Sequence, residues 1–100
     1  MQIWFRTRKL KKQYTNYMEA EKSYGKTVAR KYVQRIDIMK QVKNINELCQ
    51  LPALKCHPLK QDRKGQWAVR LTDYYRLIFT LEGDKLEIAR IEEVSRHYEN

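Results

Sequence analysis

The sequence predicts an α+β domain in which a helical hairpin packs against an antiparallel sheet. Apolar residues in the first half recur every three or four positions, which is typical of helices with one buried face. In the second half they alternate with polar residues, which is typical of strands with one buried face. Of the 100 residues, 42% are hydrophobic. This is enough for one core, so we expect a single domain over residues 1–100.

The first half predicts one strand and two helices. Residues 3–5 form a short apolar run that predicts an N-terminal strand. Residues 10–18 carry apolar side chains at helical spacing, and Gly25 ends this helix because glycine tolerates the left-handed conformation after a last turn. Residues 28–42 show the same spacing, so the two helices form a hairpin. Asn46 is expected to cap a short helical turn that follows.

The second half predicts a meander of antiparallel strands. Residues 54–59 form a short strand candidate, and residues 66–71 and 74–81 alternate strictly. A three-residue loop at residues 72–74 puts the apolar side chains of both longer strands on one face, whereas a two-residue loop would mix the faces. The side chains expected on that face are Trp67, Val69, Leu71, Tyr75, Leu77, Phe79 and Leu81.

The next turn contains Gly83 and Asp84, a pair that suits a two-residue hairpin loop. Such a loop would place Leu81 opposite Leu86. The last strand would then continue to about residue 91 with its apolar side chains on the same face.

Two arginines face each other on the opposite side of the predicted sheet. With the three-residue loop, Arg70 lies directly across from Arg76. Like charges at such positions destabilise a strand pair, and a bound phosphate would explain why both are present. The alternative is a pair that extends into solvent or bonds nearby carboxylates such as Glu87.

The charge of the chain points to a polyanionic partner. The net charge is +9, and residues 1–76 hold 18 of the 21 basic side chains but only 6 of the 12 acidic ones. Nucleic acid or the ribosome would fit this balance, although a solvated basic surface would also produce it. The longest apolar runs fall far short of the roughly 18 residues of a membrane span, and no signal peptide opens the chain. We therefore expect a cytoplasmic protein without a membrane partner.

Metal and cofactor sites have little support in the sequence. Cys49 and Cys56 lack the spacing of a zinc site and are expected to be reduced thiols. The only histidines, His57 and His97, belong to no cluster with metal-ligand spacing. We expect neither a metal nor a cofactor.

The basic residues nevertheless match what metal-independent RNA cleavage needs. A base removes the proton from the ribose 2′-hydroxyl, cations stabilise the charge that develops on the phosphate, and an acid protonates the leaving oxygen. The same groups would equally serve a plain RNA-binding surface. They are His57, Lys60, Arg63, Lys64, Arg70, Arg76 and His97.

One segment resembles a known family. HPLKQDRKGQWAVRL at residues 57–71, followed by YYRLIF at residues 74–79, resembles the HigB-like branch of the RelE/ParE toxins of bacterial type II toxin–antitoxin systems, and the resemblance extends over residues 24–98. It implies a RelE-like fold of two helices on a curved antiparallel sheet. It also implies ribosome-dependent, metal-independent cleavage of mRNA, and a cognate antitoxin that usually contains a helix-turn-helix domain.

The resemblance implies roles for individual residues. His57 and Lys60 are expected to orient or protonate the scissile phosphate of the mRNA, and Arg76 is expected to bind it. Arg70 is added by the register, and Arg63 and Lys64 belong to the same basic loop region and are expected to contact RNA.

The C-terminus departs from the family pattern. Related toxins end with an Asp-Tyr-His type of cluster, whereas this chain ends IEEVSRHYEN, with Glu92 and Glu93 at the place of the acid and His97 four residues later. If the tail forms a helical turn, Glu93 and His97 become neighbours, and the carboxylate would raise the pKa of His97 and hold it as a general acid or base. Tyr98 is expected to stack on an unpaired base.

Two other functions compete with mRNA cleavage. A ParE-like toxin would poison DNA gyrase without hydrolysing RNA, and a non-catalytic module would only bind RNA or the ribosome. The presence of His57, Lys60, Arg76 and His97 favours the nuclease, because a gyrase-binding protein has no need for acid–base groups.

Overall fold

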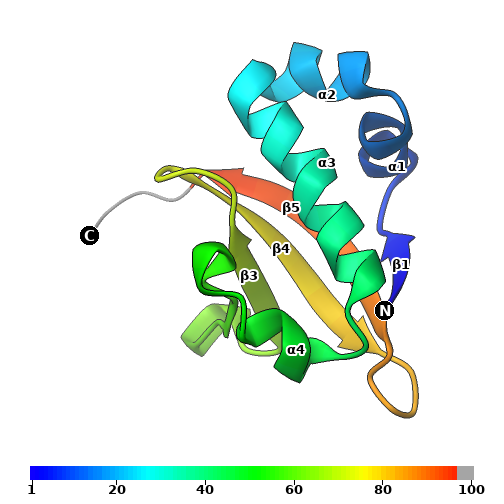
Figure 1. Cartoon of the computed structure of the whole chain (residues 1–100), viewed down its shortest axis with the longest axis vertical. Helices are drawn as coiled ribbons and strands as arrows, with labels where there is room; N and C mark the ends of the chain where they lie inside the picture. Colours follow the sequence, from blue (N-terminus) through cyan, green and yellow to red (C-terminus); the bar gives the residue numbers. More distant parts are fainter. Residues whose placement is uncertain (97–100) are drawn as a thin grey trace.

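The computed structural model, which describes residues 1–96, consists of helices packed on one face of a five-stranded sheet (Figure 1). The predicted α+β class is confirmed. Two short 3₁₀ helices, η1 (Pro52–Leu54) and η2 (Gln61–Arg63), precede and follow strand β2 in the chain. The helices are α1 (Arg8–Thr15), α2 (Tyr17–Tyr24), α3 (Lys26–Gln41) and α4 (Ile45–Cys49), and the strands are β1 (Gln2–Phe5), β2 (His57–Pro58), β3 (Gln66–Arg70), β4 (Tyr75–Glu82) and β5 (Ile88–Arg96).

The strands lie in the order β1-β5-β4-β3-β2. Strands β2 to β5 form the predicted antiparallel meander, whereas β1 pairs with β5 in parallel, so the sheet is mixed. A parallel pair needs a long crossover connection, and here the helices and the other strands lie between β1 and β5 in the chain. The N-terminal strand thus forms one edge of the sheet and β2 forms the other.

The helical half contains one more break than the apolar spacing predicts. Asn16 ends α1 and begins α2, and its side-chain oxygen accepts a hydrogen bond from the amide of Met18 at 3.2 Å. An Asn side chain competes in this way with the helical hydrogen bonds of the backbone. Gly25 separates α2 from α3 as predicted, at φ 83° and ψ 168°, a conformation that is essentially restricted to glycine. The segment at residues 10–18 therefore belongs to two helices, and Met18 is exposed.

Two local predictions between α3 and β3 are wrong. Asn44, not Asn46, caps the short helix α4, because its side chain accepts a hydrogen bond from the amide of Glu47 at 3.0 Å. Only His57–Pro58 of the predicted strand at residues 54–59 is a strand. The chain turns just before it, at Lys55, whose φ of 45° lies in the left-handed region. The backbone amides before β2 form hydrogen bonds of the 3₁₀ type instead of strand hydrogen bonds, including the one from the Lys55 amide to the Pro52 carbonyl.

The β3–β4 register is confirmed. Trp67 lies opposite Phe79, Val69 opposite Leu77 and Arg70 opposite Arg76. The amide of Leu71 donates to the carbonyl of Tyr75 at 2.9 Å, which closes the three-residue loop.

The β4–β5 register differs from the prediction. Leu81 pairs with Ala89 instead of Leu86, because the connection spans residues 83–87 rather than two residues. The amide of Leu86 donates to the carbonyl of Gly83 at 3.0 Å, and the Leu86 side chain is 50% exposed. A further shift between Ile78 and Phe79 is a β-bulge, which changes the pairing along the rest of the strands.

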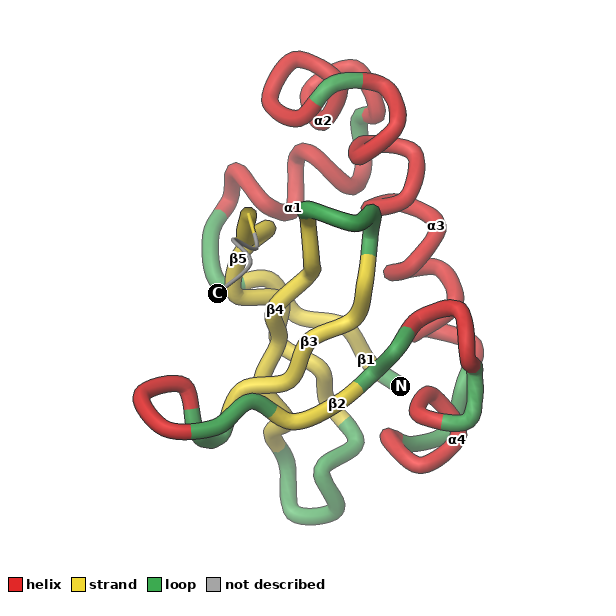
Figure 2. The backbone as a smooth tube through the Cα atoms, turned by 90° about the vertical axis from the view of Figure 1, so that its left-hand side faces the viewer, coloured by secondary structure: helices red, strands yellow, loops and turns green. Residues whose placement is uncertain are grey.

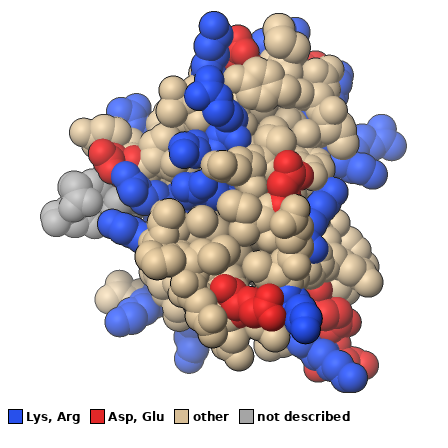
Figure 3. All heavy atoms as spheres, viewed as in Figure 1, with Lys and Arg blue, Asp and Glu red and all other residues tan. Residues whose placement is uncertain are grey.

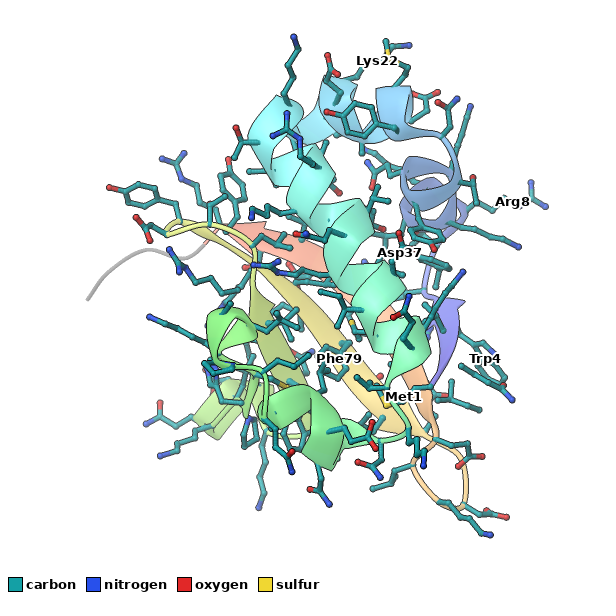
Figure 4. The ribbon with its side chains drawn as sticks, in the orientation of Figure 1. Met1, Trp4, Arg8, Lys22, Asp37 and Phe79 are labelled. Atoms are coloured by element: carbon teal, nitrogen blue, oxygen red, sulfur yellow. The ribbon has the colours of Figure 1, made fainter. Side chains whose placement is uncertain are left out.

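The core lies between α3 and the sheet. The apolar side chains that recur at helical spacing on α3 are buried. The apolar face of β3 and β4 packs against them, with Phe79 fully buried (Figure 4). Tyr32 is also fully buried, and its hydroxyl donates to the carbonyl of Leu10 at 2.7 Å, which joins α3 to α1. Residues 1–96 include no helix that is both long and apolar enough to cross a bilayer.

Because Tyr32 is buried, the free energy of unfolding is expected to change with pH in the alkaline range. Desolvation raises the pKa of the Tyr32 hydroxyl. The native state therefore holds this proton more tightly than the unfolded chain, where a tyrosine has a pKa of about 10. Above that pH unfolding releases a proton, so the free energy of unfolding falls as pH rises.

In the variant Tyr32→Phe, the free energy of unfolding is expected to decrease less steeply with pH, by up to about 1.4 kcal/mol per pH unit. Urea unfolding at pH values below and above the tyrosine pKa measures this slope. The variant also loses the hydrogen bond to Leu10, so the slope with pH is compared and not the stability at one pH. Tyr74, which is 62% exposed, provides the control variant Tyr74→Phe. Equal slopes for Tyr32→Phe and the wild type would contradict this account.

Candidate functional site

The face of the sheet opposite the helices, called the open face below, carries the two predicted arginines. Helices α3 and α4 lie on one side of the sheet, and η2 projects on the other side (Figure 2). Ala68 and Ile78 are fully buried on the open face although they are not part of the main core. Longer side chains must therefore lie across them, and Arg70 and Arg76 flank them on the same strands.

Positive charge alone does not locate the site. Lys and Arg side chains are also scattered over the helical side of the molecule (Figure 3). The open face differs because it carries Arg76, whose Nε is buried without a hydrogen-bond partner among residues 1–96 and which lines two cavities.

Arg76 is the central residue of this face. Its side chain is half-buried, and its Nε is buried without a hydrogen-bond partner within residues 1–96. Burial lowers the pKa of the guanidinium, the nearby Arg63 lowers it further, and Glu93 partly opposes both effects. A buried donor without an acceptor is costly, and no group in the described part of the chain compensates for this cost at Arg76.

Two cavities meet at Arg76. One has a volume of about 290 Å³ and the other of about 410 Å³, and Arg76 lines both. The smaller cavity is also lined by Lys55, His57, Ala68, Arg70, Asp73 and Tyr75. The larger is also lined by Leu59, Lys60, Gln61, Asp62 and Arg63. A chain with a phosphate at Arg76 would have space for its neighbouring groups on both sides.

His57 is held in a defined tautomer on the edge strand β2. It pairs with Ala68 of β3, and its Nδ1 lies 2.7 Å from the carbonyl oxygen of Lys55. A carbonyl can only accept, so Nδ1 must donate its hydrogen. In the neutral ring this leaves Nε2 without a hydrogen and able to accept a proton. The left-handed turn at Lys55 places that carbonyl within reach of the ring.

The basic loop around η2 contributes two cations, of which Arg63 is firmly held and Lys60 has no ion-pair partner among residues 1–96. Arg63 donates from Nη2 to the Glu93 carboxylate at 3.2 Å and from Nη1 to the Gln66 side chain at 3.0 Å, so it reaches from η2 across the sheet to β5. Lys60 is exposed and lines the larger cavity with Arg63. Lys64 is exposed but lines neither cavity, so the structure does not bring it to the site.

Arg70 and Arg76 differ in their partners. Arg70 forms an ion pair with Asp73 in the β3–β4 loop, whereas Glu87, the carboxylate considered from the sequence, bonds the amide of Lys85 at 2.9 Å. Arg76 forms no ion pair within the part of the chain that is described. Asp73 offsets part of the charge of Arg70, whereas Arg76 has no such carboxylate partner among the described residues.

Sequence reasoning missed a buried arginine beneath this site. Arg35 on α3 is 7% exposed, and its Nε donates to the carbonyl of Arg70 at 3.0 Å. Burial, together with the charge of Arg70, lowers the pKa of Arg35. The sequence could have indicated its burial, because Arg35 lies between Tyr32 and Ile36, two buried residues of α3. Lys55, Asp73 and Tyr75 were missed as cavity residues because only the tertiary fold brings them to Arg76.

The helical turn considered for the C-terminus does not form at residues 93–96, which belong to a strand. Glu93 lies within β5, which continues to Arg96, and its carboxylate is bonded to Arg63. Glu92 also belongs to the strand and accepts a hydrogen bond from Thr80 at 3.0 Å. His97 and Tyr98 lie outside the described residues, and their roles stay predictions.

The cysteines and possible metal ligands lie apart from this chemistry. Cys49 and Cys56 are free thiols, and burial and the neighbouring Cys49 raise the pKa of Cys56. Neither lines the two cavities at Arg76. Among residues 1–96, no three His, Cys, Asp or Glu side chains come close enough to hold a metal ion together.

Several solved structures of similar fold are toxins or toxin–antitoxin complexes. A YoeB/ParE toxin from Agrobacterium tumefaciens is 20% identical with a TM-score of 0.58, and the alignment covers 98% of this chain and 100% of that one. YafQ from E. coli strain BL21(DE3) is 15% identical with a TM-score of 0.59, covering 94% and 90%. The YoeB–YefM complex from Staphylococcus aureus contains a chain that is 19% identical with a TM-score of 0.54, covering 98% of both. At these identities the likeness is one of fold.

The sequence itself matches one family. No curated protein sequence matches the chain. A family model described as the RelE-like toxin HigB of type II toxin–antitoxin systems matches residues 4–91, which include both strands that carry Arg70 and Arg76. The chain belongs to the HigB-like toxins, which are RelE-like toxins of type II toxin–antitoxin systems.

Proposed function

We propose that this toxin is an endoribonuclease that cleaves mRNA on the ribosome without a metal ion. The observation that carries the proposal is Arg76, which forms no ion pair within residues 1–96 and lines two cavities together with other cations. A phosphodiester in these cavities would accept hydrogen bonds from the guanidinium of Arg76, which lines both of them. The nucleotides on either side of it would then occupy the two cavities.

The residues around Arg76 can divide the work of phosphodiester transfer. Nε2 of His57 accepts the proton of the ribose 2′-hydroxyl, and the O2′ atom attacks the phosphorus. Arg76, with Arg70 beside it, stabilises the negative charge that develops on the phosphate oxygens. The bond between phosphorus and O5′ breaks, and the Lys60 ammonium donates a proton to O5′. The products are a 2′,3′-cyclic phosphate and a 5′-hydroxyl, so atoms and charges balance.

The ribosome would supply what the open face lacks. The two cavities are small and open at the surface, and a flexible single strand must be held in line for the 2′-hydroxyl to attack. Binding in the ribosomal A site would place the mRNA in that geometry. Arg63 would contact RNA beside the cut, Lys64 would contact RNA outside the two cavities, and His97 and Tyr98 would add an acid–base group and a stacking surface.

The expected setting follows from this activity. Translating ribosomes place the toxin in the cytoplasm, and a cognate antitoxin, with a helix-turn-helix domain as expected for the family, would neutralise it. The solved relatives support such a partner, because the YoeB–YefM and DinJ–YafQ structures are toxin–antitoxin complexes.

Sequencing of mRNA 5′ ends after induced expression tests the proposal in cells. The wild type is expected to produce new ends within translated codons. Lys60→Gln is expected to reduce them strongly, because it removes the proposed proton donor. Lys85→Gln removes the same charge from the exposed loop at residues 83–87 and is expected to leave cleavage at the wild-type level.

Three results would contradict the proposal. Growth arrest with DNA damage and no new mRNA ends would identify a gyrase poison. No arrest and no new ends would identify a binding module. Equal effects of the two lysine variants would remove Lys60 from the chemistry.

A further inference from the structure

The only two cysteines of the chain are brought together by the turn before β2. Cys49 is the last residue of α4, and Cys56 directly precedes β2. The chain between them folds back because α4 packs against η1, and the amide of Leu54 donates to the carbonyl of Leu51 at 3.1 Å within this turn. The pKa of Cys56 is raised first by burial and then by a hydrogen bond and a charge interaction with Cys49. The two thiols are therefore within reach of each other.

The two thiols differ in their access to solvent. Cys49 is exposed, whereas Cys56 is partly buried. An exposed thiol can react with a dissolved reagent, and a partly buried one reacts most readily with a group that already lies beside it. No third His, Cys, Asp or Glu completes a metal site with them among residues 1–96. Thiol–disulfide exchange is the chemistry that fits such a pair, with Cys49 as the attacking thiol and Cys56 as the resolving one.

The turn between the thiols also positions His57. The ring Nδ1 of His57 donates to the carbonyl of Lys55 at 2.7 Å, and these two residues flank Cys56 in the chain. Lys55 and His57 both line the smaller cavity at Arg76. Lys55 has a φ of 45°, a left-handed conformation that is unfavourable for a residue with a side chain, so the turn yields most easily at this point. A displacement of Cys56 would therefore alter the hydrogen bond that sets the tautomer of His57.

We propose that Cys49 and Cys56 are a redox-sensitive pair that forms a reversible disulfide with glutathione disulfide as the oxidant, and that this bond displaces His57. The Cys49 thiolate attacks one sulfur atom of the oxidant, releases one glutathione thiolate and becomes a mixed disulfide. The Cys56 thiolate then attacks the sulfur of Cys49 and releases the second glutathione thiolate. Two protein thiols become one disulfide while one disulfide becomes two thiols, so atoms, protons and electrons balance. Excess glutathione thiol reverses the reaction.

The displacement follows from the length of the new bond. Two sulfur atoms in a disulfide lie about 2.05 Å apart, much closer than two thiols in contact. Closing the bond draws Cys56 towards α4 and weakens the hydrogen bond between His57 and Lys55. The hydrogen of the neutral ring is then no longer confined to Nδ1. The effect on cleavage rests on the proposed function: Nε2 of His57 carries the hydrogen in part of the oxidised molecules, which slows the removal of the 2′-hydroxyl proton.

Glutathione redox buffers test the disulfide on the free protein, without RNA. Because the chain has two cysteines, loss of both free thiols from a monomer without a glutathione adduct identifies the bond between Cys49 and Cys56. At one buffer composition, the ratio of disulfide to dithiol is expected to be at least about tenfold higher in the native protein than in urea, because the fold holds the thiols together. An equal or lower ratio, a glutathione adduct only, or disulfide-linked dimers only would overturn the proposal.

Nitrogen NMR of the imidazole rings measures the effect on His57. In the reduced protein, at a pH where the rings are neutral, Nε2 of His57 is expected to show the shift of a nitrogen without hydrogen, and oxidation is expected to mix the two tautomers. His57→Gln identifies the signals, since the chain has only one other histidine. Cys56→Ser keeps the exposed thiol but cannot close the bond, so its His57 signals are expected to stay as in the reduced protein in the oxidising buffer.

Unchanged His57 signals on oxidation, or the same change in Cys56→Ser as in the wild type, would also overturn the proposal. Neither measurement contains RNA or ribosomes. Failure of the proposed mRNA cleavage would therefore leave both results intact, and failure of the disulfide would leave the cleavage intact.

Discussion

Arg76→Met is expected to slow mRNA cleavage by about 10²–10³-fold, the usual cost of removing one donor that stabilises the transition state. The substitution keeps an unbranched side chain over Ile78 and removes the guanidinium that lies between the two cavities. Its Nε has no partner within the described residues, so the free fold does not depend on it. The free energy of unfolding is expected to stay within about 0.5 kcal/mol of the wild type or to rise.

Single-turnover cleavage on purified ribosomes measures this effect, and urea unfolding measures the stability. Arg90→Met is the matched control, because Arg90 is a half-buried arginine on β5 whose guanidinium faces Glu82 and Glu92 instead of a cavity at Arg76. It is expected to cleave at nearly the wild-type rate. Similar losses of activity in both variants, or unfolding of Arg76→Met, would show that Arg76 acts through the structure.

Leu77→Ala is expected to lower the free energy of unfolding by about 2–5 kcal/mol, although it neighbours Arg76 in the chain. Leu77 is fully buried and lies between Val69 on β3 and Val94 on β5. Its truncation removes apolar contacts and leaves a cavity that the surrounding side chains fill only in part.

Leu86→Ala is the control for this prediction, because the same substitution at a side chain that is 50% exposed removes little buried area. Its effect in urea unfolding is expected to stay within about 0.5 kcal/mol. A larger loss at Leu86 than at Leu77 would restore the two-residue loop at Gly83 and contradict the observed β4–β5 register.

Leu77 and Leu86 belong to the two strand pairs whose registers were predicted correctly and incorrectly. The β3–β4 register was predictable because one loop length alone puts the alternating apolar residues on a single face. The same rule failed for β4–β5 because it assumed that Leu86 is buried and allowed no bulge. A β-bulge adds one residue to a strand and shifts the alternation, and an apolar side chain in a loop looks like part of the pattern.

The helices show a similar limit. Gly25 marked a helix boundary by composition alone, and the buried stripe on α3 followed from its spacing. The break at Asn16 had no such signal, because its cap is formed by one side chain and the residue type is also found within helices.

The candidate site was predictable where it depends on register and hidden where it depends on tertiary contacts. The facing of Arg70 and Arg76 followed from the loop, and His57, Lys60 and Arg63 lie at the cavities beside them. The ion pair between Arg63 and Glu93 joins residues 30 positions apart, and Arg35 reaches Arg70 from another layer. Neither contact leaves a local pattern in the sequence.

Analysis of the RNA ends tests the proposed cleavage by the open face most directly. Purified toxin is mixed with ribosomes that hold a defined mRNA, and both products are characterised. The account predicts an upstream fragment with a 2′,3′-cyclic phosphate and a downstream fragment with a 5′-hydroxyl. It also predicts no cleavage when a 2′-deoxynucleotide replaces the one at the cut, and little with Arg76→Met. Products with a 3′-hydroxyl and a 5′-phosphate, or cleavage that survives the 2′-deoxy substitution, would contradict it.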